Sequence, residues 1–169
     1  MTLTAHHPTP LGHDAPVLID DHLVLPAASV TTASMAFLIR HSSGFACVAL
    51  LRERLRSLRV PLLLADDPDR PAYAVSVDAA AGVTTGISAH DRALTARVLA
   101  DPGADWTDLV RPGHVVPVVA RPGSTGVPEA AVELCRRTGL PPAAVLAAVA
   151  DCADPALAHL PRLSATDLC

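Results

Sequence analysis

Three short apolar runs constrain the fold of this chain more than any other feature. Residues 45–50 read F-A-C-V-A-L, residues 114–119 read H-V-V-P-V-V, and residues 141–150 are apolar throughout. Strands covered on both faces show unbroken apolar runs of this kind. The first run therefore predicts a strand buried on both faces, and the second predicts an apolar strand interrupted by Pro117. Periodicity alone leaves open whether residues 141–150 form a strand or a helix.

Helix signals alternate with these runs. Thr31-Thr32 and Ser88 are helix-capping residues, while Pro128 and Gly139 bracket a further helical pattern. We expect helices over residues 32–41, 88–100 and 129–138, further strands over 17–20, 23–25 and 73–78, and a turn over 111–113. Strands and helices alternate irregularly and no internal repeat is visible, which predicts a single α/β or α+β domain over residues 17–169. Residues 1–16 lack hydrophobic periodicity and are expected to form a flexible arm.

Composition excludes several classes of function. The formal net charge is −4 and aromatic residues make up 2% of the chain, which argues against nucleic acid as a partner. No apolar run approaches the roughly 20 residues of a membrane-spanning helix, so no membrane partner is expected. The first residues lack the basic and apolar regions of a signal peptide, and we therefore expect a cytoplasmic location with four reduced cysteines.

Composition alone indicates few residues as candidates for catalysis or binding. His22, His41, His90 and His114 each stand at the boundary of an expected element. A single histidine at such a boundary is more often structural than catalytic. The chain has no G-x-S-x-G elbow, no phosphate-binding Walker loop and no H-E-x-x-H zinc motif. The residues alone therefore indicate only a globular domain with polar turns.

Three longer segments carry a family resemblance. They are residues 39–48, I-R-H-S-S-G-F-A-C-V; residues 75–92, which include G-V-T-T-G-I-S-A-H-D-R; and residues 108–117, which include R-P-G-H-V-V-P. In this order and spacing they resemble the 3,4-dihydroxy-2-butanone 4-phosphate synthase family of the riboflavin pathway. The resemblance implies an α+β fold, an α/β/α sandwich with a mixed β-sheet. It also implies a homodimer with active sites at the subunit interface and a small-molecule substrate, ribulose 5-phosphate.

The resemblance also implies which residues face the pocket. His114 is the expected acid/base residue, because an imidazole titrates near neutral pH. Cys47 is a weaker candidate for a nucleophile, and Asp21 and His22 stand at a shortened loop. The expected substrate-binding residues are Thr84, Thr85, Asp91, Arg92, Arg111 and Val127.

The chain departs from the family pattern in three places. Most of the acidic loop that follows Asp20-Asp21 in the family is missing, and with it the metal-binding glutamate. Val127 stands where the family has its metal-binding histidine, and Ala148 stands where it has a late catalytic glutamate. A hard cation needs several oxygen ligands. These departures predict that the family's Mg²⁺ has been lost and that no cofactor or metal is bound.

Three functional hypotheses remain open at this point. The first is a repurposed enzyme that carries out metal-independent acid/base chemistry, namely cyclisation, isomerisation or elimination. Its substrate would be a less charged intermediate of specialised metabolism. The second is a non-catalytic protein that binds a ligand or a partner through the cleft that corresponds to the family's active site. The third is residual synthase activity, which converts ribulose 5-phosphate to dihydroxybutanone phosphate and formate.

Overall fold

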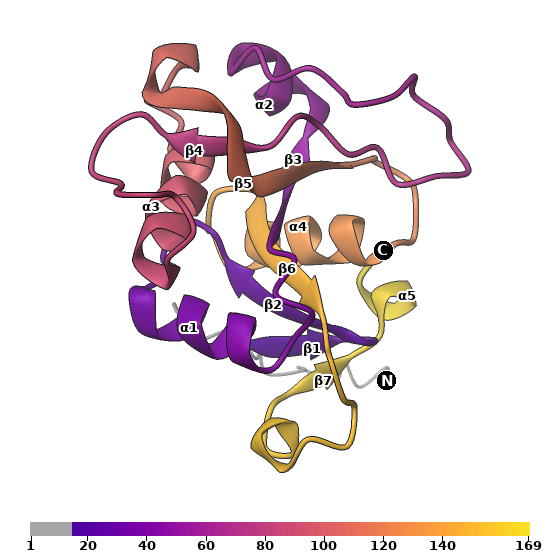
Figure 1. The fold of residues 1–169 in the computed structure, drawn as a ribbon. Helices are drawn as coiled ribbons and strands as arrows, with labels where there is room; N and C mark the ends of the chain where they lie inside the picture. The colour runs from indigo at the N-terminus through magenta and orange to yellow at the C-terminus, as the bar shows by residue number, and fades with distance from the viewer. Residues whose placement is uncertain (1–14) are drawn as a thin grey trace.

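The computed structural model describes residues 15–169 and has an α+β fold built on one mixed sheet (Figure 1). Seven strands lie in the order β4-β5-β3-β6-β2-β1-β7, with parallel and antiparallel neighbours. The elements are β1 (Val17–Ile19), β2 (His22–Pro26), α1 (Thr32–Arg40), β3 (Cys47–Leu51), α2 (Arg52–Ser57), β4 (Val77–Ala79), α3 (Ala89–Ala100), η1 (Trp106–Asp108), β5 (Leu109–Ala120), α4 (Val127–Arg137), β6 (Ala143–Ala148), η2 (Pro155–Leu157), β7 (Arg162–Leu163) and α5 (Ala165–Leu168).

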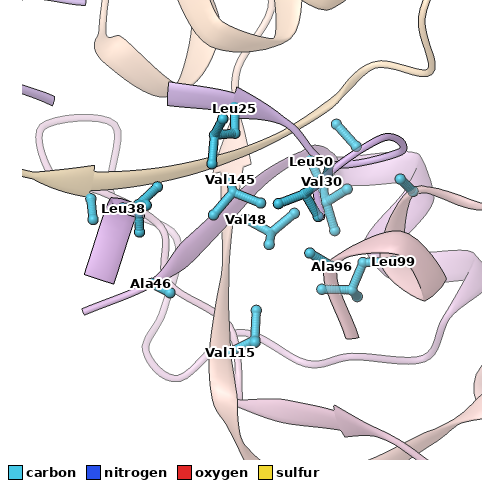
Figure 2. Close-up of a cluster of buried hydrophobic side chains, with 14 of the residues drawn as sticks. Leu25, Val30, Leu38, Ala46, Val48, Leu50, Ala96, Leu99, Val115 and Val145 are labelled. Atoms are coloured by element: carbon cyan, nitrogen blue, oxygen red, sulfur yellow. The ribbon is translucent and has the colours of Figure 1, made fainter. Parts of the chain in front are cut away.

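Two apolar cores hold helices against the two faces of the sheet. Successive strand side chains point to opposite faces, so Val48 and Leu50 join the core beneath α1 and α3. Figure 2 shows this core around Val48 and Leu50. Cys47 and Ala49 belong to the second core, beneath α4 and α5. The fold class implied by the resemblance is therefore confirmed.

The predicted helices are confirmed and the ambiguous run is resolved. Thr31 and Ser88 each accept a hydrogen bond at the first turn of α1 and α3, and α4 begins beside Pro128. Residues 141–150 contain the strand β6, which pairs with β3 on one side and with β2 on the other. Both faces of β6 are buried, one in each apolar core, which explains why its residues are apolar without alternation.

The expected turn over residues 111–113 is instead part of β5, a correction with a steric cause. The register of β4 against β5 shifts between Val77 and Asp78, so β5 bulges and brings His114 back over Asp78. Gly113 lies against the backbone of Val77 and Asp78, where any Cβ would overlap them. The expected strand over 73–78 is correspondingly short, and only Val77–Ala79 belongs to β4.

The predicted arm lies almost wholly outside the described residues, since the structure describes only Ala15 and Pro16 of it. Within residues 15–169, no helix has the length and apolar character needed to cross a bilayer.

Candidate active site

A carboxylate and an imidazole meet where β4 pairs with β5. The Nδ1 atom of His114 lies 2.8 Å from Oδ2 of Asp78, and the backbone N–H of His114 donates to Oδ1 at 2.9 Å. An ionised carboxylate only accepts, so Nδ1 carries the proton and Nε2 keeps its lone pair. The Asp78 side chain is 9% exposed and the His114 side chain is 41% exposed. The pair therefore combines a buried anchor with an imidazole that solutes can reach.

The turn that follows β4 lies against this pair. A Cβ on Gly86 would approach both Asp78 and Nδ1 of His114, and its φ of +84° lies in the region that glycine adopts most readily. Asp91 holds the turn by accepting hydrogen bonds from Thr84 and Gly86. Burial opposes ionisation of this carboxyl, but the hydrogen bonds from Thr84, His90 and Gly86 outweigh burial and hold the pKa well below its usual range.

Cys47 lies in a buried apolar environment, unlike a reactive thiol. It lies in the core beneath α4, and burial raises its pKa to about 12. The thiolate is the nucleophilic form of cysteine. A thiol that stays protonated at neutral pH does not suit the nucleophilic role expected from the sequence.

Asp21 and His22 lie at the same end of the strands as His114, but three strands away across the sheet. Ile19 pairs with His22, so β1 and β2 are joined by the two-residue turn Asp20-Asp21. His22 lies opposite Ala148 of β6, and its Nδ1 atom is 2.6 Å from Oδ1 of Asp21. Three strand spacings separate β2 from β5, or about 14 Å. In one chain these two residues form a site separate from the Asp78–His114 pair.

The remaining predicted binding residues are largely engaged in the fold. The guanidinium of Arg92 donates to the carbonyl of Gly44 at 2.9 Å, and that of Arg111 donates to the carbonyl of Leu58 at 2.6 Å. The Nε atoms of both arginines are buried without a hydrogen-bond partner. Burial also lowers the pKa of Arg92. Thr85 lies in the turn between Thr84 and Gly86, two residues that Asp91 holds in place.

Val127 lies at the other end of the sheet. It begins α4, whose first turn is tied to the end of β5 by a 2.8 Å bond from the Arg121 N–H to Glu129. The stretch of β5 from His114 to Ala120 spans about 20 Å. Val127 and His114 of one chain therefore cannot line one small pocket.

The sequence interpretation did not single out Asp78 as a functional residue. A signal was present, because Asp78 is the lone acid between Val77 and Ala79 in an apolar stretch. Aspartate is almost never fully buried unless it is paired. A buried strand position with an acid therefore predicts a partner, although it does not say which one.

The described residues of one chain do not present a preassembled set of three or more metal ligands. Residues 15–169 contain no cluster of three or more histidine, cysteine, aspartate or glutamate side chains arranged to hold a metal ion. The Asp21 side chain is 67% exposed and already contacts His22. Mg²⁺ takes near-octahedral oxygen ligands, but several of these are usually waters or substrate oxygens and only one or two are protein carboxylates. A single chain therefore supplies at most part of a magnesium site.

These features define the class of protein: an α+β domain with helices on both faces of a mixed sheet and a carboxylate–imidazole pair at one edge. The sequence model of the family described as 3,4-dihydroxy-2-butanone 4-phosphate synthase matches residues 19–166. The chain belongs to this family, and the resemblance inferred from the motifs is confirmed.

Individual relatives agree with this assignment. The 3,4-dihydroxy-2-butanone 4-phosphate synthase of Schizosaccharomyces pombe is 52% identical over 127 residues, covering 71% of this chain and 62% of the relative. The corresponding protein of Candida albicans is 48% identical over 130 residues, covering 73% of this chain and 64% of the relative. The chain thus spans somewhat less than two thirds of the length of these relatives.

Solved structures share the fold. A crystal structure of the Candida albicans synthase has a TM-score of 0.81 at 36% identity, covering 93% of this chain and 89% of that one. A synthase structure in complex with two magnesium ions has a TM-score of 0.79 at 38% identity, covering 92% and 88%.

The comparisons overturn two predictions. The main hypothesis of a repurposed cyclase or isomerase of specialised metabolism is wrong, because relatives 48–52% identical are named as synthases. They favour the third hypothesis, synthase activity. The prediction that the family's magnesium has been lost is also contradicted, because a similar protein was solved with two of these ions. Expected departures from the family pattern at three positions were an insufficient basis for either prediction, because the fold and the motifs around His114 match the family.

Proposed function

We propose that this chain catalyses the lyase reaction for which its family is named. It would convert ribulose 5-phosphate to 3,4-dihydroxy-2-butanone 4-phosphate and formate. The observation that carries this proposal is the Asp78–His114 pair, with Nδ1 and Oδ2 at 2.8 Å and Nε2 left to act on a substrate. The family assignment and the similarity to named synthases support it.

The pair suits the first chemical event that this reaction requires. Enolisation removes a proton from a carbon beside the sugar carbonyl, and a general base with a pKa near neutral does this best. Nε2 of His114 accepts that proton. Asp78 holds the imidazole in one tautomer and stabilises the imidazolium that forms, as a buried carboxylate does in hydrolytic triads. A carbon migration follows, in which C5 moves from C4 to C3, so that the C4–C5 bond breaks as a C3–C5 bond forms. Hydration of C4 and cleavage of the C3–C4 bond then release C4 as formate, and the imidazolium returns a proton to the four-carbon enediolate that remains.

A second copy of the chain would explain why other predicted site residues lie apart. Val127 and the Asp21–His22 pair are distant from His114 within one chain, so a pocket that uses all of them needs a homodimer. Phe45 and Tyr73 are exposed, and their rings meet edge to face with centroids 6.1 Å apart. They offer apolar surface for such an interface. We also propose a cytoplasmic location, which is compatible with four free thiols.

The direct test is formate release from ribulose 5-phosphate with Mg²⁺ present, comparing wild type with His114→Gln. Removal of a general base typically costs about 10²–10⁴-fold in rate. His159→Gln is the matched control, because His159 is an exposed histidine on the loop that follows η2. We expect the rate to collapse in the first variant and to stay unchanged in the second. No formate from wild type at high enzyme concentration would refute the proposed function, and equal rates in both variants would refute the role of His114.

A further inference from the structure

We propose that Asp91 is a positioning residue for the Asp78–His114 pair, acting through the backbone of the turn over residues 84–86. This inference rests on the proposed function for its catalytic meaning, whereas the positioning itself is a property of the fold. Asp91 touches neither member of the pair through its side chain. The Asp91 side chain acts through one route, the turn over residues 84–86. Its backbone carbonyl contributes a second route, which every residue at this position would keep.

The first route begins with one carboxylate oxygen. Oδ2 of Asp91 accepts three hydrogen bonds, from the N–H of Thr84 at 3.2 Å, the hydroxyl of Thr84 at 2.8 Å and the N–H of Gly86 at 3.1 Å. Asp91 is itself 1% exposed, and its backbone N–H donates to the capping Ser88 at 3.0 Å. The turn is therefore fixed to a buried, capped helix start rather than left to solvent.

The turn in its held position closes one side of the pair. A Cβ built on Gly86 would overlap Oδ2 of Asp78 and would stand 2.6 Å from Nδ1 of His114. No water molecule fits between the Gly86 backbone and these two atoms. A hydrogen bond from which water is excluded is electrostatically stronger than one in water. The turn thereby strengthens the bond that fixes the His114 tautomer.

The second route reaches Asp78 through the backbone of β4. The carbonyl of Asp91 accepts from the Thr95 hydroxyl at 2.9 Å, and the same hydroxyl oxygen accepts from the N–H of Ala79 at 2.9 Å. Ala79 directly follows Asp78 in β4, and Thr95 is fully buried. One turn of α3 thus fixes both the backbone of Ala79, next to Asp78, and the turn over residues 84–86.

The variant Asp91→Asn tests this coupling. The amide is uncharged and presents one oxygen, so three donors can no longer share an ionised acceptor, and the turn should loosen. Water then reaches the Asp78–His114 bond, and the imidazolium loses part of its stabilisation. We expect the NMR-detected titration of His114 to move to lower pH than in the wild type. The lower pH limb of kcat/KM should move the same way, with a larger effect on kcat than on KM.

The imidazole titration is read by NMR, so the test does not depend on turnover. The signal is assigned with His114→Gln. His90 must be assigned as well, since its Nδ1 lies 3.2 Å from Oδ1 of Asp91 and its titration should also move. Asp105→Asn is the matched control, because Asp105 likewise accepts from the N–H and hydroxyl of one threonine, Thr107, but in η1.

The outcomes separate this inference from the proposed function. A His114 shift in Asp91→Asn but not in Asp105→Asn supports positioning, whether or not the protein releases formate. An unchanged His114 titration in a folded Asp91→Asn protein, or the same shift in both variants, overturns it. If Asp91→Asn does not fold, Thr84→Val removes only the hydroxyl donor, and a smaller shift in the same direction is expected. An unmoved titration there would be equally decisive against the inference.

Discussion

Replacing Gly86 by alanine perturbs the candidate site in two separable ways. The first is conformational: Gly86 has a φ of +84°, and a left-handed conformation costs an L-residue about 1–2 kcal/mol. The second is steric: the new Cβ would overlap Oδ2 of Asp78 and stand 2.6 Å from Nδ1 of His114. A normal carbon contact of about 3.3 Å requires the imidazole to retreat by roughly 0.7 Å and the Asp78 carboxylate to move further still. A displacement approaching 1 Å can cost as much as about 10²-fold in rate.

Gly139→Ala isolates the conformational part. Gly139 follows α4 with a φ of +74°, and a Cβ there meets nothing within 4 Å. Thermal melts should show both variants losing a few degrees, at about 2–4 °C per kcal/mol for a domain of this size. Formate release should fall by about 10- to 100-fold in Gly86→Ala alone. If Gly86→Ala turns over as fast as Gly139→Ala, the turn does not hold the pair and the steric argument is wrong.

Further predictions concern thiol reactivity, acid stability and the core. Iodoacetamide at mildly alkaline pH should label the exposed Cys152 and spare Cys47, whose pKa is about 12; peptide mass spectrometry would detect equal labelling, which contradicts this burial. Because the folded-state pKa of Asp91 is depressed, its stabilisation is present above the unfolded value near 3.9 and is lost as pH falls below it. Asp91→Asn should therefore flatten the loss of stability below about pH 4 in urea titrations, and an unchanged slope would count against the linkage. Leu50→Ala, in the fully buried centre of β3, should lower the free energy of unfolding by about 2–5 kcal/mol in urea, and a loss well under 1 kcal/mol would contradict its core position.

Much of the fold could be predicted because its signals are local. The Thr31 and Ser88 caps predict where α1 and α3 begin, since a side-chain oxygen satisfies N–H groups of the first turn. The strand β6 could not be distinguished from a helix, because its assignment depends on ladder partners in β2 and β3 that lie far away in the sequence. Only the pairing of distant segments decides such a run.

The site was harder to predict because it depends on strand faces and on a bulge. Cys47 lies in a run without alternation, so the sequence does not show that its side chain faces α4. His114 was predicted from its motif, but its partner Asp78 was not. Their contact requires the register shift opposite Asp78 and the close approach of Gly113, neither of which has a pattern in the chain.

The Asp78–His114 pair and the other predicted site residues depend on different parts of this chain. The Asp78–His114 pair is fixed by β4, the bulge of β5 and the first turns of α3. The hydrogen bonds that hold the pair all join residues of these segments and of the turn over residues 84–86. The Asp20-Asp21 turn and the start of α4 contribute no contact to it. The geometry of the pair therefore does not depend on the β1–β2 connection. This independence explains how one chain presents an oriented imidazole at the edge of its sheet without any contact from Asp21, His22 or Val127.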